Sequence, residues 1–176
     1  MSRAFNATLV STFSPDRLYR IYVDRGEVFF IRIGGQNVVA TALASHLGLL
    51  GIFIRRALKK RADAKLAMTI AELDRQHPSS HLAAHKHNLH TPTTAIETSV
   101  LEPAAVMGAH GNHVGRWRLK LRESKEMLFQ LETLEEMKAA HALLPTIGGL
   151  HVTNVVWDPA KEKFTKAAAQ VMTAAR

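Results

Sequence analysis

Histidine is the residue type whose spacing most directly suggests chemistry in this chain. His81 and His85 stand four residues apart, so on a helix they would share one face, as in a two-histidine metal site. His87 and His90 could complete a ligand set if the chain turns, but no glutamate lies between the first pair and no acidic third ligand is near. A polar loop is the favoured interpretation, with no metal assigned, and a histidine-cluster metal-binding protein is the alternative.

Other signatures of catalysis are missing from the sequence. There is no cysteine, which excludes a disulfide scaffold, a thiolate metal site and a thiol nucleophile. Neither a glycine-rich phosphate loop with its lysine nor a GxSxG nucleophile motif occurs. The carboxylates near predicted strands are scattered, and no histidine has an evident acid–base partner. We therefore expect a protein that is not an enzyme and that uses no cofactor.

Charge gives the strongest functional indication. The net charge is +8 and the pI is about 10.1, which favours anionic partners such as phospholipid, nucleic acid or acidic proteins. One basic group follows an apolar stretch, residues 38–54, and consists of Arg55, Arg56, Lys59, Lys60 and Arg61. Helical spacing places positions 55, 56, 59 and 60 on one face, which suits docking on an anionic membrane. For residues 38–54 themselves the favoured interpretation is a buried helix that crosses the sheet, because a bilayer span needs about 20 apolar residues, and membrane insertion is the alternative.

A second basic group lies on a predicted strand. Arg116, Arg118, Lys120 and Arg122 alternate with Trp117, Leu119 and Leu121, so the cations form a row on one face. This row could bind nucleic acid, but alternation turns Trp117 toward the core, where it cannot stack on bases. We consider a solvated outer strand face the more probable use of these cations.

The elements that must position these groups are best defined between residues 115 and 148. Strands are expected at 116–122 and 127–131, joined as an antiparallel hairpin. Thr133 and Glu136 form a capping box, which predicts that a helix starts there and runs to Ile147, where Gly148 and Gly149 end it. An amphipathic helix thus follows the last strand of a sheet whose inner face it can cover.

The remaining residues predict several shorter elements. Residues 1–16 are expected to be a loose lead-in, and a hairpin is expected at 18–33 with its turn at 24–27. Further predictions are a helix over 62–76, a strand over 95–101, and an extended segment over 151–157. Asp158 and Pro159 then predict the start of an alanine-rich helix over 161–175.

This order of elements resembles the bacterial pleckstrin-homology-like and GRAM-like domains. The resemblance extends over about two thirds of the chain, and the segments that carry it are 88–92, 95–100, 117–121, 128–131 and 134–147. The resemblance implies an α+β fold with an antiparallel sheet or barrel and a capping helix. Residues 1–176 would form a single domain, with 35–76 as a helical insertion and 150–176 as a C-terminal extension. The lysine-rich first hairpin of phosphoinositide binders is replaced here by Arg20, Arg25 and Arg32.

These observations predict a non-catalytic binding or scaffold domain. The expected partner is an anionic lipid surface or a protein, with nucleic acid as the weaker alternative. Residues 1–17 contain no apolar run long enough for a secretory signal, so we expect a cytoplasmic protein, peripheral at the inner face of a membrane. The alanine-rich C-terminal segment and the Gly48–Gly51 segment could also serve as self-association surfaces.

Overall fold

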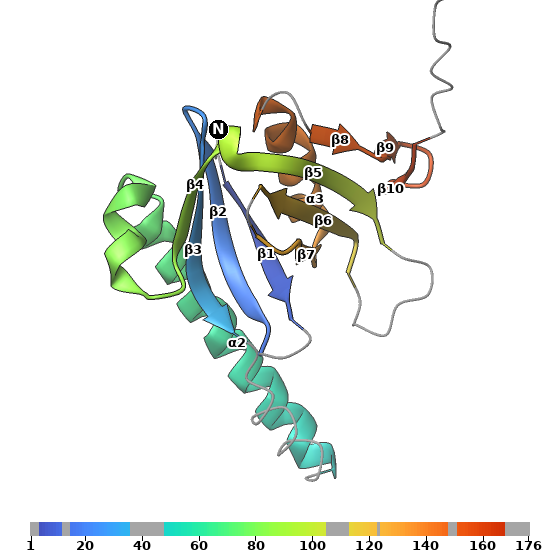
Figure 1. Ribbon diagram of the computed structural model, residues 1–176. Helices are drawn as coiled ribbons and strands as arrows, with labels where there is room; N and C mark the ends of the chain where they lie inside the picture. The colour runs from blue at the N-terminus through green and yellow to red at the C-terminus, as the bar shows by residue number, and fades with distance from the viewer. Residues whose placement is uncertain are drawn as a thin grey trace, which may run out of the picture.

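The computed structural model shows an α+β protein built on one large mixed sheet (Figure 1). It describes residues 4–11, 15–35, 48–104, 113–122, 124–147 and 151–167, and of residues 48–59 it describes the helical backbone only. The strands are β1 (Ala4–Val10), β2 (Arg17–Asp24), β3 (Glu27–Gly35), β4 (Leu89–Pro92), β5 (Ile96–Pro103), β6 (Gly115–Leu121), β7 (Met127–Leu131), β8 (His151–Thr153), β9 (Val155–Asp158) and β10 (Lys163–Lys166). The helices are α2 (Gly48–Leu73) and α3 (Leu134–Leu143), with 3-10 turns η1 (Pro78–Ala84), η2 (Thr93–Ala95) and η3 (Leu144–Ile147).

The large sheet consists of two antiparallel meanders joined along β1 and β7. Its strand order is β4-β3-β2-β1-β7-β6-β5-β8, and only the pairing of β5 with β8 is parallel. The two end strands, β4 and β8, are not paired with each other, so the sheet is open. The expected α+β class is confirmed, whereas the barrel alternative is wrong. A separate two-stranded sheet, β9 with β10, follows β8.

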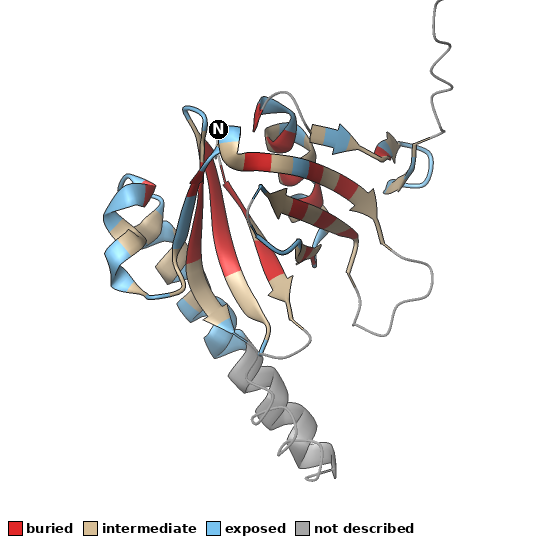
Figure 2. Cartoon of the chain, viewed as in Figure 1, coloured by how far each residue is buried: buried red, intermediate tan, exposed pale blue. Residues whose placement is uncertain are grey.

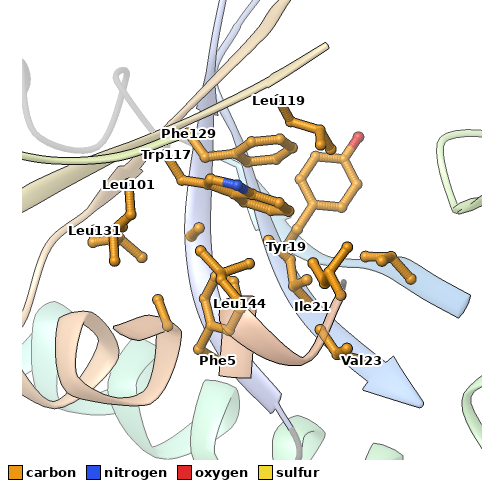
Figure 3. Close-up of a cluster of buried hydrophobic side chains, with 14 of the residues drawn as sticks. Phe5, Tyr19, Ile21, Val23, Leu101, Trp117, Leu119, Phe129, Leu131 and Leu144 are labelled. Carbon is orange, nitrogen blue, oxygen red and sulfur yellow. The ribbon is translucent and has the colours of Figure 1, made fainter. Parts of the chain in front are cut away.

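The sheet curves sharply around its aromatic side chains. Phe30 on β3 and Trp117 on β6 are separated by four strand spacings, roughly 19 Å in a flat sheet. Their rings nevertheless stack with centroids 6.1 Å apart, and Phe129 on β7 stacks on Trp117 at 5.1 Å. Figure 3 shows the rings of Trp117 and Phe129 gathered with aliphatic side chains of the inner face, and Phe30 belongs to the same cluster. The concave face is therefore one continuous core.

Alternation along the strands decides which side chains enter this core. On β6, Trp117 and Leu119 are fully buried, whereas Arg116, Arg118 and Lys120 are half-buried, and Figure 2 shows buried and half-buried residues alternating along this strand. The core position of Trp117 is confirmed. Its indole Nε1 donates a hydrogen bond to Ser99 Oγ at 2.9 Å, so the one polar atom of the buried ring has a partner.

Helix α3 closes the concave face. The capping box is confirmed, because Thr133 accepts from the Glu136 amide while the Glu136 carboxylate accepts from the Thr133 amide. Met137, Ala140 and, in η3, Leu144 are buried against the strands. The helix changes to a 3-10 turn at Leu144, and Gly148 and Gly149 lie outside the described residues.

Two predictions at the ends of the chain are wrong. The expected lead-in contains β1, a central strand whose Phe5 and Ala7 enter the core and whose Thr8 pairs with Gln130 of β7. The expected C-terminal helix is replaced over Lys163–Lys166 by β10. Asp158 Oδ1 does cap following amides, those of Ala160 and Lys161, but the turn that it closes returns the chain antiparallel to β9. Residues 168–176 lie outside the described part.

Helix α2 is attached to the convex face by a charged cluster. Asp74, just after the helix, accepts from Arg20 Nη2 at 2.8 Å, Arg20 Nε at 3.3 Å and the Tyr22 hydroxyl at 2.7 Å. Burial, followed by the hydrogen bond to Asp74, raises the pKa of Tyr22.

A second, small core lies beside this charged cluster. It consists of Ala4, Tyr22, Phe29 and Ile31, and Leu73 and Leu82 pack against it. The predicted helix over 62–76 and its break at His77 and Pro78 are confirmed.

Glycine at position 115 sets the distance between β6 and α3. A Cβ there would lie 2.8 Å from Met137 Cε and closer still to its Sδ. We expect Gly115→Ala to lower the free energy of unfolding by about 1–3 kcal/mol, because the core would be overpacked. Gly34→Ala is the matched control, since its Cβ would meet Leu18 at an ordinary 3.7 Å. Equal stability of the two variants in urea denaturation would contradict this account.

The Arg20–Asp74 contact gives a second prediction. Asp74→Ala removes a carboxylate from a guanidinium whose side chain is only 10% exposed and from the Tyr22 hydroxyl. We expect a loss of about 1–3 kcal/mol in the free energy of unfolding, because hydrogen bonds to charged groups are the strong ones. Asp63→Ala, at an exposed position of the same helix, should change it by less than about 0.5 kcal/mol. A cost at Asp74 no larger than at Asp63 would show that the cluster does not hold α2.

Candidate functional site

Three cations from three separate elements converge beside α2. Arg17 at the start of β2, Arg32 on β3 and Lys65 on α2 line a hollow of about 600 Å³, which we call the basic hollow. Its other lining residues are Pro15, Asp16, Leu18, Ile33, Gly34, Gly35, Ala62, Leu66, Thr69 and His87. The open end of the β2–β3 hairpin forms one side and the exposed flank of α2 forms the other.

Arg32 is positioned by the histidine-rich segment that follows η1. Its Nη1 lies 2.7 Å from His85 Nε2, its Nε donates to Gly34 O at 3.4 Å, and its backbone amide donates to Asn88 Oδ1 at 2.8 Å. The His87 amide also points at His85, at Nδ1 and 3.1 Å. A neutral imidazole has one acceptor nitrogen, so only one of these two donors can be satisfied by the ring at a time. Arg32 is thus held in place while keeping donors to spare.

The basic hollow carries an excess of positive charge. Among the described residues, no carboxylate lies within ion-pair distance of Arg17, Arg32 or Lys65. Asp16, whose Oδ1 accepts from the Ser11 amide at 3.3 Å, is the one carboxylate among the described lining residues and offsets part of this charge. Desolvation, followed by the charges of Arg17 and Lys86, lowers the pKa of His87, which favours its neutral form. An anion entering the hollow would meet three cations, none of them held in an ion pair, and one carboxylate.

The predicted basic group on α2 adjoins this hollow. Arg55, Arg56 and Lys59 lie on the helical backbone of α2, but their side chains are outside the described part, as are residues 38–47 altogether. Lys60 and Arg61 are exposed. Arg61 stands four residues before Lys65, so the two share a helix face. Within the described residues, no helix combines the length and the apolar content that crossing a bilayer requires.

The predicted basic row on β6 is in contrast largely neutralised. Glu102 on β5 accepts from Arg118 Nη2 at 2.7 Å and from Arg116 Nη2 at 3.3 Å, and Glu97 accepts from Lys120 Nζ at 2.7 Å. Arg122 is exposed. Sequence reasoning treated the two glutamates as scattered, although a β5–β6 hairpin register would have placed Glu102 opposite Arg116. The solvated-face interpretation describes this row better than a nucleic-acid surface does.

The histidine pair predicted to share a helix face does not do so. His81 lies in η1, whereas His85 follows it with an extended backbone (φ −151°, ψ 134°). Pro78 opens a 3-10 turn here rather than an α-helix, and a 3-10 turn has a different repeat. Among the described residues, no three histidine or acidic side chains are grouped as metal ligands. His90 instead stacks on Phe29 and contacts Glu27 at 3.2 Å.

A serine–histidine pair that sequence reasoning missed joins β5 to β8. Ser99 Oγ lies 3.0 Å from His151 Nδ1 and accepts from the Trp117 indole, which leaves the hydroxyl proton for the imidazole. Such a pair resembles an activated nucleophile, but Ser99 is 0% exposed, so no substrate reaches it. We interpret the chain Trp117–Ser99–His151 as a structural link that secures the short strand β8.

Comparisons of the chain with protein-family models, with curated proteins and with solved structures found no match.

The serine–histidine link predicts a pH dependence of stability. Burial, followed by the charge of His141, lowers the pKa of His151 below its ordinary value near about 6.5. The unfolded chain therefore takes up this proton first, and the free energy of unfolding should fall as the pH drops below about 6.5. His151→Gln removes this titration. The variant should lose less stability than the wild type between about pH 7.5 and pH 5, measured by urea denaturation. Parallel pH profiles would overturn the assignment.

Proposed function

We propose that this chain is a non-catalytic binding domain that docks on anionic membrane surfaces through the basic hollow and the adjoining flank of α2. The observation that carries the proposal is the convergence of Arg17, Arg32 and Lys65 without a carboxylate partner among the described residues. Cations already paired with carboxylates offer little net attraction to a distant anion, whereas unpaired cations grouped in a concave site add their fields.

The contrast between the two basic groups favours a surface at α2 over one on β6. An anionic partner on β6 would have to compete with Glu97 and Glu102, which already occupy Lys120, Arg116 and Arg118. At the basic hollow, none of the three cations is in an ion pair with a described residue, and Asp16 is the one acidic residue in the described lining. The same contrast makes nucleic acid a weaker candidate partner, because the cations on β6 that suggested nucleic-acid binding are mostly paired with glutamates.

The length and composition of α2 support a membrane rather than a small soluble anion as the partner. The helix begins with the apolar sequence GLLGIFI, continues through the basic residues 55–61 and then reaches Lys65 at the hollow. At about 1.5 Å per residue, Gly48 and Lys65 are roughly 25 Å apart along one helical rod. An apolar end, a basic middle and a headgroup-sized hollow in line suit the interface between acyl chains and headgroups. A peripheral position at the inner face of a membrane agrees with this arrangement.

Vesicle binding provides the test. Neutralising the hollow with Arg17→Gln, Arg32→Gln and Lys65→Gln should weaken binding to phosphatidylserine-containing vesicles by about 10- to 100-fold, since each cation near such a surface contributes about 1 kcal/mol. Binding of the wild type should fall as salt is raised and should be weak on pure phosphatidylcholine. Co-sedimentation measures both effects.

A matched variant separates the hollow from overall charge. Arg75→Gln, Arg122→Gln and Lys125→Gln remove the same three charges from exposed positions away from the hollow, so this variant should bind almost as the wild type does. Charge reversal at Arg55, Arg56, Lys59 and Lys60 should abolish binding, because these cations lie on the part of α2 that would face the membrane. If the two triple variants weaken vesicle binding equally, the net charge of the protein and not the basic hollow is responsible. If the wild type binds neither kind of vesicle, the proposal is refuted.

A further inference from the structure

A second, larger hollow lies at the other end of the sheet order from the basic hollow. It measures about 910 Å³ and is bounded by the ends of β5 and β6, the first residue of α3, and β10. We call it the apolar hollow because its walls include Pro103, Ala104, Val114, Leu134 and Phe164. A volume of several hundred Å³ with mostly apolar walls and a few polar groups is typical of sites for small organic ligands.

The walls are held by contacts of their own, so the apolar hollow exists without a ligand. Phe164 on β10 packs against Trp157 at a centroid distance of 5.2 Å and against His141 of α3 at 5.3 Å. The Asn154 amide donates to Leu101 O and the Ala167 amide donates to Asn154 O, which ties the β9–β10 sheet to β5. Asn154 also lines the hollow. The β9–β10 hairpin is thus fixed over the end of β5.

The rim of the apolar hollow is positively charged. Lys163 and Lys166 are exposed, and among the described residues neither has a carboxylate within ion-pair distance. Arg116 lines the hollow too, but its guanidinium is paired with Glu102 and its Nε is shielded from solvent. Glu102 and Glu162 are the acidic lining residues, and Glu162 sits on the exposed turn. Lys163 and Lys166 are therefore the lining cations that a ligand can reach.

We infer that the apolar hollow binds an amphipathic carboxylate, a molecule with an unbranched hydrocarbon body and one anionic head. The body would cover Val114, Leu134 and Phe164, which replaces water on apolar walls. The head would lie at Lys163 and Lys166, which are exposed and have no ion pair among the described residues. This site shares no residue with the basic hollow and does not depend on the proposed membrane docking.

Shape and charge together favour an amphipathic carboxylate over a small inorganic anion and over a neutral hydrocarbon. A small inorganic anion would leave the apolar walls wet and would find a stronger set of cations in the basic hollow. A neutral hydrocarbon would gain the same burial but would leave the lysine rim without an anionic partner. Only a ligand with both a hydrocarbon body and an anionic head would cover the apolar walls and also pair with the lysines of the rim.

Titration of the full-length chain with decanoate tests the inference. Isothermal calorimetry should show saturable binding of one decanoate, with a change in tryptophan fluorescence because Trp157 packs on Phe164. Acetate lacks the hydrocarbon body and should not bind at the same concentration, and 1-decanol, without the charge, should bind about tenfold more weakly.

Three variants locate the ligand. Lys163→Gln with Lys166→Gln should weaken decanoate about tenfold, as expected for two exposed cations, but should leave decanol unchanged. Leu134→Gln, at a half-buried wall position, should weaken decanoate and decanol alike. Arg17→Gln with Lys65→Gln, in the basic hollow, should have no effect on either. Thermal unfolding checks that each variant is folded, and the two lysine substitutions are at exposed positions.

Several outcomes would overturn the inference. Absence of saturable decanoate binding would do so, and so would affinity unchanged by both the lysine and the Leu134 variants. Loss of binding in the Arg17 and Lys65 variant alone would place the ligand in the basic hollow instead. Vesicle binding by the wild type is a separate measurement, so failure of this site and failure of membrane docking can be told apart.

Discussion

The contact between Phe30 and Trp117 is the constraint on which the rest of the structure depends. Two rings on strands that are not neighbours meet only if the sheet between them curves, and Phe129 fills the space beside them. Curvature gives the sheet a concave face that one short helix, α3, can cover (Figures 1 and 3). Burial of these large rings supplies the driving force, because aromatic side chains remove more apolar surface from water than any others.

The convex face that results from this curvature is divided between two polar arrangements. Over β2 and β3, Asp74 joins Arg20 and Tyr22 and so fixes the C-terminal end of α2. Over β5 and β6, no helix is seen in the described residues, and cross-strand pairs of glutamate with arginine or lysine cover the sheet instead. In the described residues, the cations on β6 are therefore mostly paired with carboxylates, whereas the three cations of the basic hollow beside α2 are not.

Features of the sequence that act over a few residues predicted the corresponding structure well. Alternation in β6 and β7 and the capping box of α3 depend on neighbours within one turn or one strand, so the pattern alone indicates the result. Prediction failed where a distant partner decided the outcome. Strand β1 pairs with the neighbouring β2, but it is a central strand because its other edge pairs with β7, more than 100 residues away in the chain. The alanine-rich composition of residues 161–175 favours a helix, but over β10 pairing with β9 and packing of Phe164 prevail.

The sequence by itself determined the excess of positive charge, the absence of cysteine chemistry and the basic character of α2, because these are properties of composition and local order. Only the tertiary structure decided which cations are available. Arg17, Arg32 and Lys65 are far apart in the chain and meet because the β2–β3 hairpin lies against α2. From the sequence, Arg116 and Arg118 could not be distinguished from unpaired cations. The β5–β6 register places Glu102 beside them in the folded protein. Coulomb energy depends on distance in space, and chain separation does not fix that distance.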